Sequence, residues 1–65
     1  MLNSAFEDRY KGVYYKINFH NFENGWTFEL HIEGLPRIRD EDHIWKTKED
    51  AYEAARKAAE ATIDG

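Results

Sequence analysis

Two runs of alternating apolar and polar residues, joined by a turn dipeptide, constrain the fold of this chain more than any other feature. In residues 13–19 and again in residues 26–33, an apolar side chain occupies every second position. In a β-strand this period places all the apolar side chains on one face. Asn24 and Gly25 lie between the runs, and this dipeptide is typical of the two-residue turn of a β-hairpin. The sequence therefore predicts two half-buried antiparallel strands.

The turn also predicts the register of this hairpin. With Asn24 and Gly25 as the two loop residues, apolar side chains face each other in the pairs Ile17–Ile32 and Phe19–Leu30. On the polar face the same register forms the pairs Lys16–Glu33, His20–Glu29 and Asn18–His31. A slip by one residue would turn the apolar side chains of one strand toward solvent.

The segments outside the hairpin are less regular. Residues 1–8 show no period and are interpreted as a flexible N-terminal arm. Residues 34–42 begin with the turn-forming sequence Gly34-Leu35-Pro36 and continue with many charges, which indicates a solvated connection. A short third strand is expected at residues 43–46. Ile44 and Trp45 are neighbours there, so one of them must point away from the core.

The last segment has the features of an amphipathic helix. Thr47, followed three residues later by Asp50, approximates a capping box. An apolar stripe at helical spacing follows, formed by Ala51, Tyr52, Ala55, Ala58, Ala59, Thr62 and Ile63. Together the segments predict an α+β fold, in which a three-stranded antiparallel β-meander packs on one C-terminal α-helix as a two-layer sandwich. Residues 9–65 are expected to form this single β-β-β-α domain after the arm of residues 1–8.

The composition of the 65 residues argues against several kinds of protein. Thirteen acidic and nine basic residues give a net charge of −4, which is unfavourable for a surface that holds phosphate backbones. The chain has no cysteine, so disulfides, zinc–thiolate sites and thiol nucleophiles are excluded. The longest apolar run, residues 13–15, is too short for a signal-peptide core or a membrane span. A reducing cytoplasm is the expected location.

No motif indicates catalysis or a metal centre. His20 and His31 share the predicted polar face with Glu29, but such faces are usually solvated, and nothing in the sequence marks groups that would orient these side chains. The acids at 40–42 are consecutive and no glycine follows them, unlike in a calcium loop. No serine or threonine lies at a spacing from a histidine that implies a nucleophile and its base. We therefore expect no enzyme, no metal and no cofactor.

Side chains off the buried face are the candidates for binding a partner. These are Tyr10, Tyr14, Lys16 and His31, since exposed aromatic groups on a sheet can anchor a protein or stack on bases. In the predicted meander, the strand of residues 13–19 is a long edge without proline. Two copies would pair through this first strand about a two-fold axis near Tyr14, giving a homodimer. The alternative is that residues 1–8 fold back over this edge and leave a monomer.

Three short motifs carry a resemblance to known DNA-binding folds. They are Tyr10-Lys11-Gly12-Val13, Gly25-Trp26 and the Trp-Lys-Thr-Lys-Glu-Asp-Ala sequence of residues 45–51. In outline they resemble the plant ethylene-response-factor type DNA-binding domain, which, like the arm-binding domains of phage integrases, packs a three-stranded sheet on one helix. That family reads DNA with arginines and tryptophans on the exposed sheet face. The corresponding strand here offers Thr27, Glu29, His31 and Glu33, so the resemblance implies the fold and not the DNA contacts.

Residues 10–64 also resemble short uncharacterised bacterial proteins, often from prophages. The shared features are the Gly-Trp strand, a Thr-x-Glu-Asp/Glu-Ala helix start at residues 47–51, and an alanine-rich helix that closes on Ile63-Asp64. These motifs determine the fold. They imply no known activity.

Three functions are compatible with these patterns. The favoured one is a small non-enzymatic domain that binds a protein, itself included, because charge is mixed and edge strands are available. A nucleic-acid-binding module on the sheet face is an alternative, for which Arg9, Lys11 and Lys16 would supply a local basic patch, although the net charge makes nucleic acid an unfavoured partner. The other alternative is an acidic phage-encoded inhibitor that occupies the basic groove of a nucleic-acid-binding protein. No membrane partner is expected.

Overall fold

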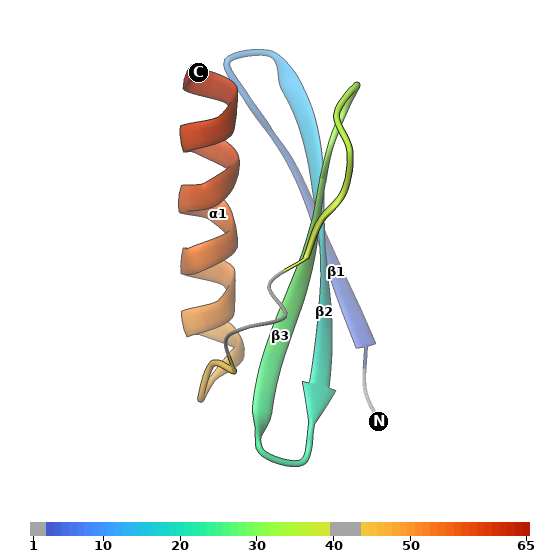
Figure 1. The fold of residues 1–65 in the computed structure, drawn as a ribbon, viewed down its shortest axis with the longest axis vertical. Coiled ribbons are helices and arrows are strands. Elements are labelled where there is room, and N and C mark those ends of the chain that lie inside the picture. The colour runs from blue at the N-terminus through green and yellow to red at the C-terminus, as the bar shows by residue number, and fades with distance from the viewer. Residues whose placement is uncertain (1–2, 40–43) are drawn as a thin grey trace.

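The computed structural model describes residues 3–39 and 44–65, which form an antiparallel sheet and one helix in two layers (Figure 1). The strands are β1 (Asn3–Tyr10), β2 (Val13–Phe22), β3 (Gly25–Ile32) and the two-residue β4 (Ile38–Arg39), and the helix is α1 (Lys48–Asp64). The strands lie in the order β1-β2-β3-β4 across the sheet. The predicted α+β class and the antiparallel sheet with a C-terminal helix are confirmed.

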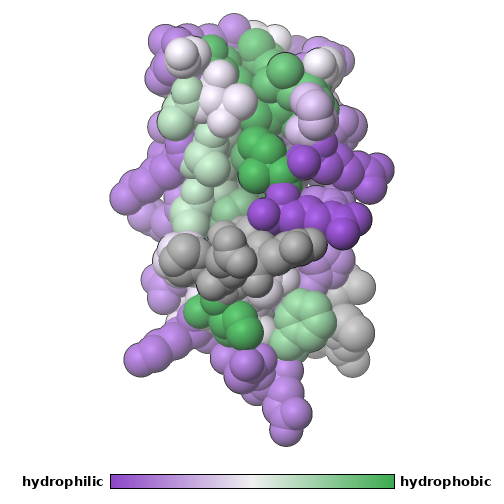
Figure 2. All heavy atoms as spheres, viewed as in Figure 1, coloured by the Kyte–Doolittle hydropathy of each residue, from purple (hydrophilic) through white to green (hydrophobic). Residues whose placement is uncertain are grey.

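The core lies between α1 and one face of the central strands. Alternate residues of β2 and β3 are buried there, together with three alanines of α1: Tyr15, Ile17, Phe19, Phe28, Leu30, Ile32, Ala51, Ala55 and Ala59. The faces predicted from the period of two are therefore correct. Figure 2 shows hydrophobic residues gathered between the helix and the sheet, with hydrophilic residues to either side. Small alanines let the helix approach the sheet, whose large side chains fill the space between the layers.

The N-terminal segment is a strand, so the prediction of a flexible arm is wrong for residues 3–8. All eight residues of β1 pair with β2, from Asn3 opposite His20 to Tyr10 opposite Val13. Phe6 and Tyr10 face the core side, but the charged Asp8 falls between them on the same face. This one charge interrupts the alternation from which a strand would have been predicted.

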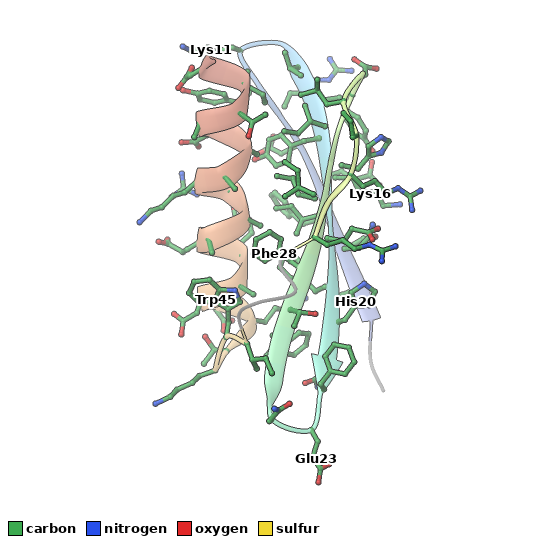
Figure 3. The ribbon with its side chains drawn as sticks, viewed as in Figure 1. Lys11, Lys16, His20, Glu23, Phe28 and Trp45 are labelled. Carbon is green, nitrogen blue, oxygen red and sulfur yellow. The ribbon has the colours of Figure 1, made fainter. Side chains whose placement is uncertain are left out.

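The β2–β3 hairpin has a different register from the predicted one. Its core-side pairs are Tyr15–Ile32, Ile17–Leu30 and Phe19–Phe28, and its polar-face pairs are Lys16–His31, Asn18–Glu29 and His20–Thr27. Phe22 pairs with Gly25, so the loop residues are Glu23 and Asn24, and Glu23 lies at the tip of the hairpin in Figure 3. The shift from the prediction is two residues. A shift by an even number keeps every side chain on its predicted face.

Gly25 belongs to the strand because another segment approaches it closely. A Cβ atom at this position would lie 2.5 Å from both the Ile44 Cγ2 atom and the Trp45 carbonyl oxygen, and its φ is +146°. The backbone turn with two positive φ angles occurs instead in the β1–β2 hairpin, at Lys11 (φ 53°) and Gly12 (φ 80°). These values are typical of the type I′ turn, the two-residue hairpin turn that Asn-Gly commonly forms.

The segment after β3 contributes two short contacts to the sheet edge. β4 lies within the stretch predicted to be only a solvated connection, and Ile38 pairs with Leu30. The third strand predicted at 43–46 is reduced, in its described part, to a bridge between Trp26 and Trp45, whose backbone hydrogen bonds measure 2.7 and 2.8 Å. His43 lies outside the described residues. Trp45 packs against the core, whereas Ile44 is 49% exposed.

The helix begins as the sequence predicts. The Thr47 hydroxyl oxygen accepts a hydrogen bond of 3.1 Å from the backbone N–H of Asp50. This N-cap bond satisfies one of the donors that the first helical turn leaves unpaired. No helix in the described part of the chain is both long and apolar enough to cross a membrane.

We expect Gly25→Ala to lower the free energy of unfolding by about 2 kcal/mol or more, because it combines an unfavourable φ with the loss of the close approach of Trp45. Gly34→Ala is the matched control. Gly34 also has a positive φ (81°), but a Cβ there meets nothing within 4 Å. Urea denaturation should therefore give a loss of only about 1 kcal/mol for the control. Equal losses for the two variants would show that the approach of Trp45 does not constrain position 25.

Candidate interaction site at the edge of the sheet

The four residues predicted to bind a partner do not form one site. Tyr14, Lys16 and His31 lie on the face of the sheet away from α1, and Lys16 is directly opposite His31. Figure 3 shows Lys16 on this outer face. Tyr10 lies on the other face, where it packs against the core next to the end of the helix.

The outer face is polar and carries charged side chains of both signs. Its basic side chains are Arg9, Lys16, Arg37 and Arg39, and its acidic side chains are Glu7, Glu29 and Glu33. Glu29 forms ion pairs with Arg39 at 2.8 Å and with Arg37 at 3.6 Å. The Tyr14 hydroxyl donates a 2.7 Å hydrogen bond to Glu7, and this bond raises the pKa of the phenol. Two of the four basic side chains on this face are therefore paired with one carboxylate.

His20 and His31 are too far apart to bind one metal ion together. His31 is opposite Lys16, four positions along β2 from His20, which corresponds to about 13 Å. Within the described residues, no group of three histidine or acidic side chains is arranged to hold a metal ion.

β1 is the longer of the two edge strands of the sheet. β1 is eight residues long and contains no proline, and no strand in the described part of the chain pairs with its side opposite β2. The helix packs on β2 and β3, so it leaves β1 at the side of the two-layer structure. An edge of this kind presents a row of N–H and C=O groups that can pair with another strand.

An apolar hollow of about 340 Å³ lies beside the N-terminal half of this edge. It is lined by Ala5, Phe6, Phe19, Lys48, Glu49 and Tyr52. The rings of Phe6 and Tyr52 meet edge to face, with centroids 4.9 Å apart and an interplanar angle of 81°. The Lys48 ammonium lies 5.4 Å from the centre of the Phe19 ring. Aromatic side chains therefore line a hollow beside an unpaired strand edge, and the basic Lys48 and the acidic Glu49 also contribute to its lining.

Ser4 adds an unusual polar group to the same part of β1. It is on the core-side face of the strand, two residues before Phe6 and opposite Phe19. Its hydroxyl oxygen is buried and has no hydrogen-bond partner among the described residues. Buried hydroxyl groups are normally hydrogen-bonded, because an unpaired one costs free energy of desolvation.

The C-terminal end of β1 is connected to the C-terminal end of α1 by a hydrogen bond and an ion pair. The Tyr10 hydroxyl donates a 3.1 Å hydrogen bond to Asp64, and the Lys11 ammonium forms an ion pair with the same carboxylate. Figure 3 shows Lys11 beside the C-terminal end of α1. The bond from Lys11 holds the pKa of Asp64 below its ordinary value. Desolvation of the carboxylate opposes this effect, and the bond from Tyr10 adds to it. The bond to Asp64 raises the pKa of Tyr10 and of Lys11.

Sequence reasoning missed this edge because it assigned the strand to an arm. A signal was nevertheless present. A hairpin centred on Lys11-Gly12 places Tyr10 opposite Val13 and Phe6 opposite Ile17, so apolar residues meet on one face. The homodimer predicted through residues 13–19 is wrong for the same reason, since β2 is paired on both sides. As the alternative prediction had it, the N-terminal segment covers that edge.

Comparison with protein-family models, with curated proteins and with solved structures gave no match for this chain. The assignment of a function therefore depends on the geometry of the sheet and its edge.

We expect Lys11→Met to raise the pKa of Asp64 toward its ordinary value, because the variant removes the cation that favours the carboxylate. Since the pKa of Asp64 is lowered in the folded state, the ion pair stabilises the fold above a pH of about 4, and this contribution is lost as the pH falls through the folded pKa. The stability difference between wild type and Lys11→Met should thus disappear in acid. Carboxyl carbon chemical shifts would report the pKa directly, with Lys57→Met as the control. An unchanged Asp64 titration in Lys11→Met would contradict the assignment.

Proposed function

We propose that this protein is a small non-enzymatic protein-interaction domain that binds an extended segment of a partner along the outer edge of β1. The observation that supports this proposal most directly is the combination of an unpaired eight-residue edge and the adjoining hollow of Phe6 and Tyr52. The edge supplies hydrogen-bonding groups, and the hollow supplies apolar surface.

Strand addition uses these two features in different ways. Main-chain hydrogen bonds to the edge provide affinity for any extended segment, while alternate side chains of the added strand point to the two faces of the sheet. Those on the helix side meet Phe6 and Tyr52, so apolar side chains are favoured there. Those on the other side meet the charged outer face and remain solvated. The site therefore selects an alternating apolar and polar segment.

A library of extended peptides selected against the immobilised protein tests this proposal. Bound peptides should shift the backbone amide signals of residues 3–10 and of Tyr52 in nitrogen-15 spectra, and should alternate apolar and polar residues. Phe6→Ala should weaken their binding by about ten-fold or more. Ile38→Ala should leave it unchanged, since Ile38 is 36% exposed and lies in β4, at the opposite edge of the sheet. Binders that instead shift Lys16 and His31 on the outer face would contradict the proposal.

Nucleic-acid binding on the outer sheet face is the second candidate. Four of the nine basic residues gather on this face, while the whole chain has a net charge of −4. The ion pairs of Glu29 and the position of Glu7 opposite Lys16 nevertheless offset much of this positive charge. A phosphate backbone would have to displace these carboxylates, so we favour the protein partner.

We expect no measurable affinity for duplex DNA or RNA at about 50 mM salt and neutral pH, because Arg37 and Arg39 already pair with Glu29 and the whole chain has a net charge of −4. Fluorescence anisotropy with labelled duplexes would measure this. Glu29→Gln is a useful comparison, since it removes the carboxylate between Arg37 and Arg39. Micromolar binding by the wild type, falling steeply with added salt, would overturn the protein-interaction proposal in favour of the nucleic-acid one.

A further inference from the structure

We infer that the segment that occupies the β1 edge is β1 of a second copy of this chain, paired antiparallel about a two-fold axis that passes beside Phe6. The inference rests on the proposed function and identifies its partner. The paired sheets would then form one continuous sheet across two chains, with both helices on the same side.

Symmetry restricts the registers in which two β1 strands can pair. When a two-fold axis perpendicular to the sheet relates two antiparallel strands, directly opposite side chains point to the same face of the sheet. One residue of the strand then lies directly opposite the same residue of the second copy, and the axis passes between the two. Within the strand, the candidate axis positions differ in charge. An axis at Glu7 or at Asp8 would place two identical carboxylates opposite each other, which is unfavourable. An axis at Phe6 brings two aromatic rings together instead.

The Phe6 register also supplies a partner for the unpaired hydroxyl of Ser4. In this register, Ser4 of one copy lies opposite Asp8 of the other, and both residues are on the core-side face. One carboxylate oxygen of Asp8 accepts the backbone N–H of Arg9 at 2.7 Å, and its other oxygen can accept from Ser4. A serine hydroxyl changes direction by rotation about one bond. The pairing occurs twice because of the symmetry.

The apolar surface beside the edge is self-complementary in the same register. Phe6 of each copy contacts its mate at the axis, and the hollow of Phe6 and Tyr52 in one copy continues into that of the other. On the outer face, Ala5 lies opposite Glu7, so a small side chain faces the charged one and no like charges meet. The distribution of charge, the apolar surface and the hydrogen bonding therefore all favour the register with the axis beside Phe6.

Sedimentation equilibrium over a range of about 10 to 500 μM tests whether the dimer forms, in a range suited to a weak interface. The mass should rise from 7.7 kDa toward twice that value with concentration. Ser4→Ala gives a sharper readout. It should stabilise the monomer against urea, because it removes a buried unpaired hydroxyl, and yet raise the dimer dissociation constant by about five-fold or more. A Ser4→Ala protein whose dimer dissociation constant falls or stays unchanged would overturn the pairing of Ser4 with Asp8.

The absence of native cysteine allows the register to be tested directly. Ala5→Cys and Glu7→Cys proteins are prepared separately, mixed and oxidised. Directly opposite residues have Cβ atoms close enough for a disulfide, so the mixed disulfide between the two variants should form faster than either symmetric one. Both positions are exposed on the outer face, so neither substitution disturbs the core. Predominance of a symmetric product would contradict the axis at Phe6.

The two proposals can fail separately. A monomer throughout the concentration range would overturn the inference of a second copy, while library peptides that shift residues 3–10 would leave the strand-binding function standing. A dimer in which neither cysteine variant forms a disulfide between the two chains would overturn the inference as well.

Discussion

The fold depends on how α1 packs on the sheet. Ala51, Ala55 and Ala59 are fully buried, and they bring the helix close to β2 and β3. One helix with so narrow a contact stripe covers the width of about two strands, since helices are about 10 Å across and strands lie about 4.8 Å apart. β1 therefore remains at the side, where Tyr52 contacts Phe6. The position of the open edge is a consequence of the alanine stripe.

The faces of the sheet could be predicted from the sequence, but the pairing of its strands could not. A period of two specifies which side chains are buried in β2 and β3, and this property is unchanged by the two-residue shift of register. The register itself is set by a contact distant in sequence. Trp45 pairs with Trp26 and occupies the space next to Gly25, so the glycine serves a close approach and not the turn. Local turn preferences contain no information about that approach.

The candidate site was harder to predict for a related reason. The sequence predicts Tyr10, Tyr14, Lys16 and His31 to lie off the buried face, yet the structure distributes them over both faces of the sheet. What distinguishes the β1 edge is backbone geometry, namely a strand with a neighbour on one side only. Side-chain patterns do not report that property. Asp8 further obscured it by interrupting the apolar alternation of β1.

The connection between Tyr10 and Asp64 bears on the order in which the chain folds. The two hairpins join neighbouring segments through two-residue loops, and such local pairings form within microseconds. The bond from Tyr10 to Asp64 instead joins residues 54 positions apart and closes a loop of nearly the whole chain. Its entropic cost is met only once the helix is already docked on β2 and β3. We therefore expect the hydrogen bond between Tyr10 and Asp64 to form last on folding and to break first on unfolding. Its loss would release the C-terminal turn of the helix while the meander of β1, β2 and β3 persists.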